Sequence, residues 1–382
     1  MTGDIGIIGY GQSVYEKKTE RSLMWFLADA SRRALESAGM KMRDIDGLAV
    51  GSFELPPDNA VTLAEQFGIS IGWAYMVTAG SGGPIPAVLN AIRAVEAGQA
   101  ESVLVVVGDT YDVQGLFDMM DDLNGALRDY AAPHGFGGPN GLLAMVTSKH
   151  MNRFGTTAEQ LGRICVDQRA NAGLNDNALL RDPMTMDDYL SARPIADPLR
   201  LYDCVMACAG AEAVVIGPLD RVPGGHGVRV LSGYERHNHP PGETVPLEGG
   251  WTMFRDRLWN DAGMGPGDMQ FLNAYDDYPI MVAIQLEDLG FCAKGDVGPY
   301  LDTLTMTHDG NLPLNTGGGQ LSCGQSGMGG GLMLVTEACR QLRGEAGARQ
   351  VEGARRGCVS GYGMVGYGHG LAASAAVLEV AS

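Results

Sequence analysis

The sequence contains no apolar run that approaches the roughly 20 residues needed to cross a membrane. No basic segment or cleavage site separates Met1 from the strand-like stretch that begins at Asp4. Basic residues are scarce, because 27 Lys and Arg stand against 45 Asp and Glu, for a formal charge of -18 at pH 7. A protein of this sign repels phosphate backbones and anionic membranes. We therefore expect a cytoplasmic protein that binds neither nucleic acid nor membrane.

The sequence also lacks the paired cysteines of disulfide frameworks and zinc sites. Its seven cysteines are scattered, and none forms a CxxC pair. Cys204 and Cys208 are the nearest two in sequence, but no histidine or second cysteine pair completes a zinc set around them. We expect reduced thiols, no metal site and no bound cofactor.

Strand-like and helix-like segments alternate along the chain. Residues 5–9 are apolar and strand-like, and residues 22–38 have the period of an amphipathic helix. A further helix is expected at 82–97, where Gly98 ends it before a strand of the buried type at 102–108. This alternation predicts an α/β protein built in layers.

The alternation breaks between residues 110 and 200, where Gly, Pro, Asp and Asn are frequent and short helices are expected. A segment of this length commonly covers a site. Strand-like residues return at 211–216, and the Gly- and Pro-rich residues 217–227 are typical of a link between domains. The alternation then resumes. We expect two similar halves, residues 1–220, which carry the covering insertion, and residues 225–382.

Six short motifs are distributed over nearly the whole chain. They are MNRFGTT (151–157), DQRANA (167–172), ARPIADP (192–198), EDLGFCAK (287–294), LPLNTGGGQL (312–321) and QLRGE (341–345). Together they resemble the thiolase superfamily, and among its members the sterol-carrier-protein-x type and its lipid-transfer-protein relatives. The resemblance implies a thiolase-like, five-layered αβαβα fold of two pseudo-repeated halves, assembled as a homodimer.

The cysteine that accepts the acyl group in this family is replaced. In the family it begins a helix that ends at a glycine, and counting back from Gly98 gives Ser81. A serine hydroxyl needs an adjacent base to act as a nucleophile, and residues 78–86 supply none. Ser81 is then either a helix cap or a residue that binds the substrate.

Other positions of the family's active site have changed as well. Gln325 stands where the family has the histidine of a GHP motif, and an amide cannot take a proton. Cys323, nearby, is either a migrated nucleophile or a buried, inert thiol. In the last Gly-rich segment, Cys358 is expected in a strand and Tyr362 at the tip of a loop. His369 follows, and is either catalytic or held by the backbone.

The stretch Tyr275-Asp276-Asp277-Tyr278 matches the family motif HDCF or NEAF, whose His or Asn lies over the thioester oxygen. We expect Tyr275 and Tyr362 to converge on the substrate as base and acid, with Tyr278 or Asp276 in support. The alternative is that both tyrosines are core or loop aromatics. The substrate-binding and oxyanion-hole candidates are Ser81, Gly82, Gly361, Gly363, Gln325 and His369.

Thiolysis needs a thiolate and a base, and both are missing. Retro-aldol cleavage of a β-hydroxyacyl-CoA needs no such thiolate, and lipid-transfer-protein relatives include aldolases that shorten the steroid side chain as coenzyme A thioesters. The resemblance thus implies a carbon–carbon lyase acting on a bulky acyl-CoA, working with a small OB-fold partner protein. The alternatives are a non-catalytic acyl-CoA or lipid-binding subunit, and an acyltransferase that uses Ser81 or Cys323.

Overall fold

The computed structural model describes residues 4–381 apart from 56–58, 113, 116–124, 126, 136–137, 240–242, 244 and 367–368. The strands are β1 (Ile5–Gln12), β2 (Gly47–Gly51), β3 (Trp73–Met76), β4 (Val103–Asp109), β5 (Pro194–Ala196), β6 (Leu199–Arg200), β7 (Gly210–Pro218), β8 (Val228–His237), β9 (Phe271–Ala274), β10 (Arg356–Gly366) and β11 (His369–Val380). The helices are α1 (Leu23–Ala38), α2 (Asn59–Phe67), α3 (Pro84–Glu96), α5 (Gly138–Phe154), α6 (Ala158–Gly173), α7 (Met186–Ser191), α8 (Arg255–Ala262), α9 (Pro279–Asp288), α10 (Val297–Thr303), α11 (Gly319–Cys323) and α12 (Gly329–Leu342).

Local sequence sets the ends of α1 and its distance from the sheet. The Ser22 side chain caps its first turn by accepting a hydrogen bond from Trp25 N, and Gly39 ends it in the left-handed region at φ 68°. Gly9 of β1 faces the helix, and a Cβ there would stand 2.4 Å from Ala34 O. Glycine is therefore what lets α1 lie directly on β1.

Hydrogen bonds join nine strands in the order β3-β2-β4-β7-β1-β8-β11-β10-β9. β2 runs parallel to β3 and β4, and β9 runs parallel to β10, whereas the other pairs are antiparallel. β1 and β8 are registered at Ile7 and Val228, near the start of each strand. The mixed α/β fold that the sequence predicts is confirmed.

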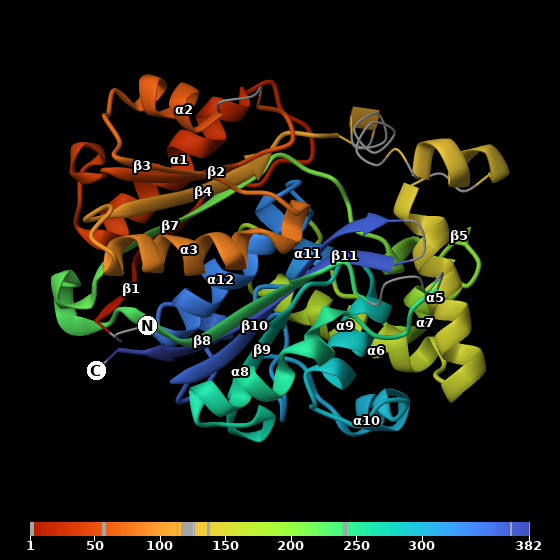
Figure 1. Ribbon diagram of the computed structural model, residues 1–382. Helices are drawn as coiled ribbons and strands as arrows, with labels where there is room; N and C mark the ends of the chain where they lie inside the picture. Colours follow the sequence, from red (N-terminus) through yellow and green to blue (C-terminus); the bar gives the residue numbers. More distant parts are fainter. Residues whose placement is uncertain are drawn as a thin grey trace.

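The elements stack in five layers, as Figure 1 shows. One apolar cluster lies between α1, α2 and the strands β2, β4, β7 and β1, and it includes Phe26 and Leu63. A second lies between the two groups of strands, where α3 and α12 supply Ile92 and Leu332. The third packs α6, α8 and α9 against β9, β10 and β11. The αβαβα arrangement is thus observed, while the division into two separate domains at 220–225 stays a prediction.

Tyr362 lies in a strand, which corrects the loop predicted from the sequence. β10 continues from Arg356 to Gly366, and Tyr362 pairs with Ala373 of β11. Cys358 is in the same strand, as expected. The glycines of β10 suggested a loop, but Gly363 is required there for close packing, because a Cβ on it would stand 2.5 Å from Gly82 N of the turn that lies on the strand.

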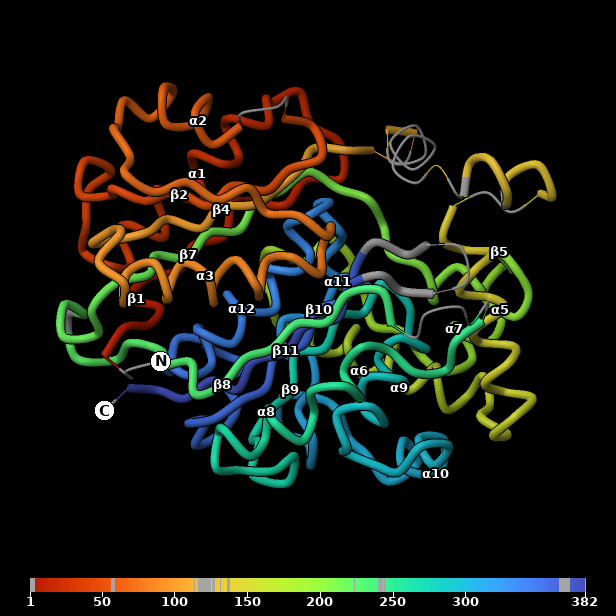
Figure 2. The backbone as a smooth tube through the Cα atoms, in the orientation of Figure 1, coloured from red at the N-terminus to blue at the C-terminus, as the bar shows by residue number. Residues whose placement is uncertain are grey.

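The predicted insertion contains longer helices than expected. α5 and α6 have 17 and 16 residues, whereas α7, with six, and the turns at 127–131 and 132–134 are short. Polar residues obscure the period of α6, which nevertheless buries Leu161 and Ile164 against α9. In Figure 2 the tube through α5, α6 and α7 lies beside α9, so the insertion covers the second half of the chain.

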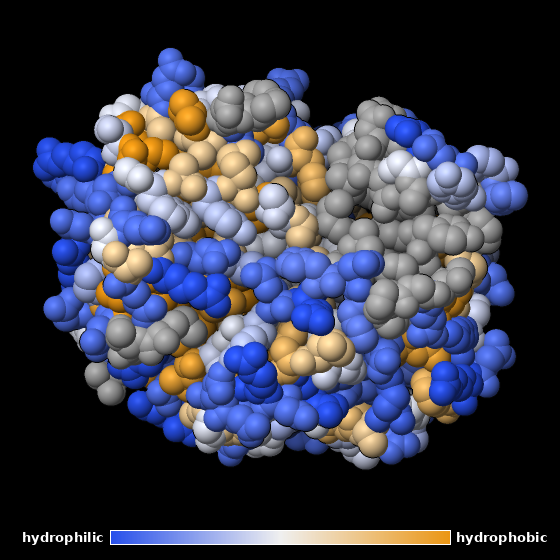
Figure 3. All heavy atoms as spheres, viewed as in Figure 1, coloured by the Kyte–Doolittle hydropathy of each residue, from blue (hydrophilic) through white to orange (hydrophobic). Residues whose placement is uncertain are grey.

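The visible surface is mainly hydrophilic. Hydrophilic residues cover much of the face shown in Figure 3, with hydrophobic residues interspersed. No helix in the described part of the chain is both long and apolar enough to span a bilayer.

Glu337 of α12 fixes the Gly-rich motif at 315–319 to its surroundings. Arg340 and Arg349 approach its Oε2 to 2.6 and 3.1 Å, and Thr316 Oγ1 donates to Oε1 at 2.9 Å. Burial raises the pKa of this carboxyl, but the two guanidinium groups outweigh burial and lower it to about 2. The carboxylate is therefore charged at neutral pH and fully paired.

Glu337→Gln keeps the shape of the side chain but leaves Arg340 and Arg349 without their counter-ion. We expect the free energy of unfolding, measured by urea denaturation at pH 7, to fall by about 3 kcal/mol. The control is Glu345→Gln, because Glu345 pairs with Arg343 at 3.1 Å from an exposed position. It should cost less than about 1 kcal/mol. Equal losses in the two variants would contradict this role for Glu337.

Candidate active site

The segment 275–278 connects β9 to α9 and is held against β10. Tyr275 N donates to Ser360 O at 3.0 Å. Gln285 of α9 fixes the same junction, because its Nε2 donates to Tyr275 O at 2.7 Å and its Oε1 accepts from Ser360 Oγ at 2.6 Å. This junction brings Tyr275 to Tyr362, two residues beyond Ser360 on β10.

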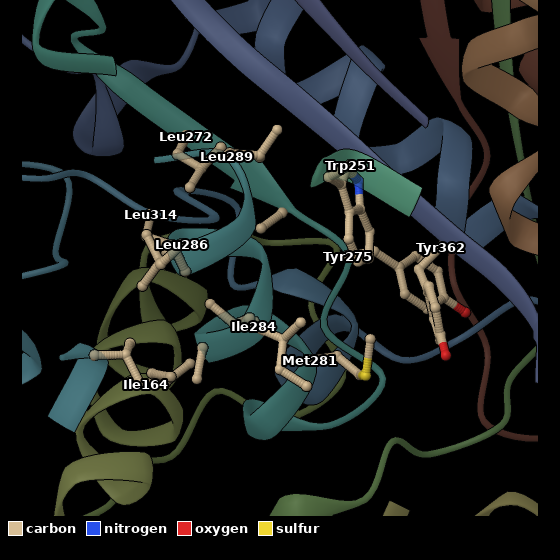
Figure 4. Close-up of a cluster of buried hydrophobic side chains, with 14 of the residues drawn as sticks. Ile164, Trp251, Leu272, Tyr275, Met281, Ile284, Leu286, Leu289, Leu314 and Tyr362 are labelled. Carbon is tan, nitrogen blue, oxygen red and sulfur yellow. The ribbon is translucent and has the colours of Figure 1, made fainter. Parts of the chain in front are cut away.

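Tyr275 and Tyr362 lie together, as the sequence predicts. Their ring centroids are 6.4 Å apart and the rings are inclined at 51°. Trp251 stacks on Tyr362 at 5.5 Å, and its indole N–H donates to Ser374 O at 3.1 Å. In Figure 4 the two phenol oxygens point to the same side, away from the aliphatic cluster around Leu286. The pair therefore presents two hydroxyls to one place.

Burial raises the pKa of both phenols far above the ordinary value for tyrosine. The negative charge of Asp277 raises the pKa of each phenol further. Both hydroxyls are consequently protonated at neutral pH, so they can donate hydrogen bonds to an oxyanion. Neither has the properties of a base, which opposes the base role that we predicted for one of the two.

Gln325 and Ser81 both hydrogen-bond with the Tyr275 hydroxyl. Gln325 Nε2 donates to it at 2.9 Å, and the Ser81 side chain also hydrogen-bonds with it. Ser81 Oγ donates to Gly327 O at 2.9 Å. The N-cap of α3 is Gly83, without a side-chain bond, so the helix-cap interpretation of Ser81 is wrong. Ser81 and Gln325 instead position Tyr275.

The glycines of the site permit close backbone contact. A Cβ on Gly363 would stand 2.5 Å from Gly82 N, and one on Gly361 would stand 2.6 Å from Ser374 Oγ. Gly82 N–H donates to Ala79 O at 3.2 Å. Because that N–H is already bonded within its own turn, we do not assign Gly82 to an oxyanion hole. Gly82, Gly361 and Gly363 let the turn before α3 lie on β10.

Asp276 has a structural role, in contrast to the supporting catalytic role expected from the sequence. Its carboxyl is buried and accepts from Gln320 N at 3.0 Å and from Leu321 N at 3.2 Å, at the start of α11. Burial raises its pKa to about 6, although these N–H groups lower it. The hydroxyl of Tyr278 donates to Asn140 Oδ1 of α5 and so ties the covering segment to the site.

Asp277 is the residue that the sequence analysis missed. Its side chain is 7% exposed, and its Oδ1 has no hydrogen-bond partner among the described residues. Burial and the adjacent Asp276 raise the pKa of Asp277 to about 8. The signal in the sequence was a pair of acidic residues between two tyrosines at the end of a strand, but sequence alone does not tell which of the two is satisfied.

Two candidates remain, Cys323 and His369. Cys323 is buried, donates to Gly317 O at 3.0 Å, and has a pKa raised by burial, so it is not a ready nucleophile. His369 pairs with Gly366 through the backbone of β11, but its side chain lies outside the described residues. Within the described residues, no group of three or more His, Cys, Asp or Glu side chains could hold a metal ion.

A cavity of about 520 Å³ lies beside α5. Its lining includes Gly141, Ala144, Met145 and Lys149 of α5, together with Val245. Gly141 follows Asn140, which accepts a hydrogen bond from Tyr278, so α5 connects the cavity to the segment 275–278. Its volume is in the range of small-molecule sites.

The chain is similar to two kinds of enzyme. A family model described as thiolase C-terminal domain-like matches residues 256–378. The chain is 30% identical to the 17-hydroxy-3-oxo-4-pregnene-20-carboxyl-CoA lyase of Mycobacterium tuberculosis, over 90% of this chain and 92% of the relative. It is 28% identical to an acetyl-CoA acetyltransferase of Methanothermobacter thermautotrophicus, over 95% of this chain and 97% of the relative.

A solved structure gives a third comparison. The structure described as Ltp2-ChsH2(DUF35) aldolase superposes with a TM-score of 0.84 at 27% identity, covering 99% of this chain and 98% of the other. Overall identity to the lyase and to the acetyltransferase is nearly equal, so the two activities are distinguished by the side chains of the site.

Asp276→Asn tests the structural role of that carboxyl. An amide has one acceptor oxygen where the carboxylate has two, so either Gln320 N or Leu321 N loses its partner. We expect a loss of about 1–3 kcal/mol in the free energy of unfolding, measured by urea denaturation at pH 7. Asp277→Asn is the matched control and should lose nothing, because the free Oδ1 accepts no bond. If Asp276→Asn is as stable as the control, the structural assignment is wrong.

Proposed function

The chain belongs to the thiolase superfamily, and from that premise we propose that it is a carbon–carbon lyase. It cleaves a bulky β-hydroxyacyl-CoA of the steroid side-chain type by a retro-aldol reaction, giving a ketone and a shortened acyl-CoA. The single observation that carries this proposal is the pair of adjacent, buried phenols of Tyr275 and Tyr362, whose raised pKa values keep them protonated. The resemblance to the superfamily matches both residues to segments that carry its catalytic groups.

The reaction requires one proton acceptor and donors for an enolate. When a base takes the proton of the β-hydroxyl, the oxygen forms a carbonyl and the Cα–Cβ bond breaks. The bonding electrons move onto the thioester as an enolate, which then takes a proton at Cα. Donors fixed in a site that excludes water stabilise the enolate oxygen strongly. Two phenols with raised pKa values supply donors that stay protonated throughout.

Tyr362 is the freer of the two donors. Its hydroxyl makes no hydrogen bond within the described part of the chain, whereas that of Tyr275 already accepts one from Gln325. We assign the first contact with the enolate oxygen to Tyr362 and the second to Tyr275, which Gln325 and Ser81 orient. The acyl group would extend toward the cavity beside α5, where Ala144 and Met145 are apolar.

The assembly is also part of the proposal. We infer a homodimer, and a small OB-fold partner protein, in a cytoplasmic setting. The aldolase structure that superposes on this chain carries a name that joins two components, Ltp2 and ChsH2(DUF35), which supports a second protein. The homodimer, the OB-fold and the location rest on the resemblance to the family.

The acyltransferase alternative is disfavoured by the cysteine that would have to carry the acyl group. Cys323 is 2% exposed and its pKa is raised by burial. Ser81 has Tyr275 and Gln325 near its hydroxyl, and neither is a base. A non-catalytic acyl-CoA binder remains the second candidate, because loss of the thiolase residues is also what degeneration would produce.

Tyr362→Phe and Tyr275→Phe each remove one hydroxyl and keep the ring packing. We expect each variant to lower kcat by about 100-fold or more, with acyl-CoA affinity within a few-fold of wild type. Turnover is measured by mass spectrometry of the ketone and the shortened acyl-CoA, from a β-hydroxyacyl-CoA with a steroid-like tail, with and without the partner protein. Tyr300→Phe on α10 is the control and should leave kcat unchanged.

Two outcomes would contradict the proposal. Wild-type turnover in a tyrosine variant would remove that tyrosine from the mechanism. Binding of the thioester without any product, even with the partner present, would identify the protein as an acyl-CoA binder.

A further inference from the structure

We propose that Asp277 is the general base of this site, and that its free Oδ1 takes the proton from the β-hydroxyl of the substrate. The inference rests on the proposed lyase function and assigns the one role that the two tyrosines cannot fill. It makes Asp277, rather than Asp276 or a tyrosine, the residue that begins the cleavage.

The Asp277 carboxyl has a buried oxygen without a hydrogen-bond partner among the described residues. Buried carboxyl groups elsewhere in the described structure have partners on both oxygens, as in Asp109, Asp203, Glu212, Asp276 and Asp288. Asp277 Oδ1 is the sole buried carboxyl oxygen without a partner among the described residues. Leaving such an oxygen unpaired is costly, and a position of this kind is typical of a functional group.

Asp277 also interacts electrostatically with the other side chains of the site. The charge of Asp277 acts on the phenols of Tyr275, Tyr278 and Tyr362 and on the thiol of Cys204. Backbone N–H groups of residues 277 and 278 hydrogen-bond to the carboxyl, and they hold it in place while Oδ1 stays free. A substrate that contacts the two phenols is therefore within the same electrostatic environment as Asp277.

The pKa of Asp277 also suits a general base. A general base acts best when its pKa lies near the working pH. Burial, with the adjacent Asp276, raises the pKa of Asp277 to about 8. Burial takes the two phenols far above that range, so they keep their protons. The acidic groups of the site are thus separated into one acceptor and two donors.

Asp277 takes up one proton and returns it within each turnover. The carboxylate takes the β-hydroxyl proton, the C–O bond becomes a carbonyl, and the Cα–Cβ electrons pass into the thioester enolate held by Tyr362 and Tyr275. The carboxylic acid of Asp277 then returns the same proton to Cα. The products are the ketone and the shortened acyl-CoA, with the enzyme in its starting state and no oxidant or co-reactant consumed.

The test uses the full chain with its partner protein and the β-hydroxyacyl-CoA described above. We expect Asp277→Asn to lower kcat by about 100-fold or more, with KM within a few-fold of wild type. We expect Asp277→Ala to regain part of its activity when formate is added, because formate can occupy the place of the missing carboxylate. Asp256→Asn on α8, an exposed aspartate paired with Arg255, is the matched control and should keep wild-type kcat.

The pH profile separates a base from a structural residue. The ionisable groups that interact electrostatically with Asp277 are Asp276, Tyr275, Tyr278, Tyr362 and Cys204. Of these, Asp276 alone has a pKa between 5 and 9, because burial raises it to about 6. Wild-type kcat should therefore rise with pH through about 8 as Asp277 loses its proton. The residual rate of Asp277→Asn should lack that rise.

Stability gives an independent check on folding. A carboxyl whose pKa is higher in the folded than in the unfolded state contributes stability that is complete below the unfolded pKa, about 4, and is lost as pH rises to about 8. The melting temperature of Asp277→Asn should accordingly equal that of wild type near pH 4 and exceed it by a growing margin as pH rises to about 8. A variant that fails to melt cooperatively is replaced by Asp277→Ala with formate, where rescue itself reports a folded site.

The outcomes distinguish the base assignment from the function on which it rests. If wild type cleaves the substrate and Asp277→Asn cleaves it equally fast with the same pH profile, the base assignment is overturned and the lyase stands. If wild type makes no product at all, the proposed function fails and the base assignment fails with it. Loss of kcat with formate rescue and retained KM supports Asp277 as the base.

Discussion

The site depends on one close contact between two backbones. The turn at Gly80–Gly82, from the first half of the chain, lies on β10 from the second, with room for no Cβ on Gly363. Ser374 Oγ of β11 donates to Gly82 O at 3.0 Å across the same contact. Side chains that surround this contact, including Ser81, Tyr275 and Tyr362, are thereby withdrawn from water.

Burial of these side chains then determines which of them donate and which accept protons. The same loss of hydration raises the pKa of a phenol, which is ordinarily about 10, further above the physiological range and brings the pKa of a carboxyl close to that range. Tyr275 and Tyr362 become permanent donors, and Asp277 becomes a group that can exchange a proton near neutral pH. A superfamily fold that serves thiolate chemistry in other members can in this way serve an enolate reaction without a thiolate.

Much of the fold could be predicted from the sequence, because its signals are local. The period of α1, with Ser22 before it and Gly39 after it, gives the helix almost to the residue. The strand that holds Tyr362 could not be recognised, since its glycines are typical of a loop and their partners lie on another strand, β11. The helices α5 and α6 were hidden by polar residues that face the surface or each other.

The candidate site could likewise be predicted from the sequence only in part. The replacement of the family's cysteine and histidine by Ser81 and Gln325, and the convergence of the two tyrosines, followed from the motifs. The distinction between Asp276 and Asp277 did not, because it depends on the N–H groups of Gln320 and Leu321, which lie far away in sequence. Local patterns identify residues at a site, whereas partners from distant segments decide what each one does.

In the proposed reaction the phenols of Tyr275 and Tyr362 keep their protons while a carboxyl acts as the base. An ultraviolet titration of tyrosinate absorbance, comparing wild type with the double variant Tyr275→Phe, Tyr362→Phe, measures this directly. The difference between the two proteins should show no ionisation from pH 6 to pH 10, because burial raises both pKa values. A tyrosinate signal that titrates near neutral pH in wild type and vanishes in the variant would contradict it.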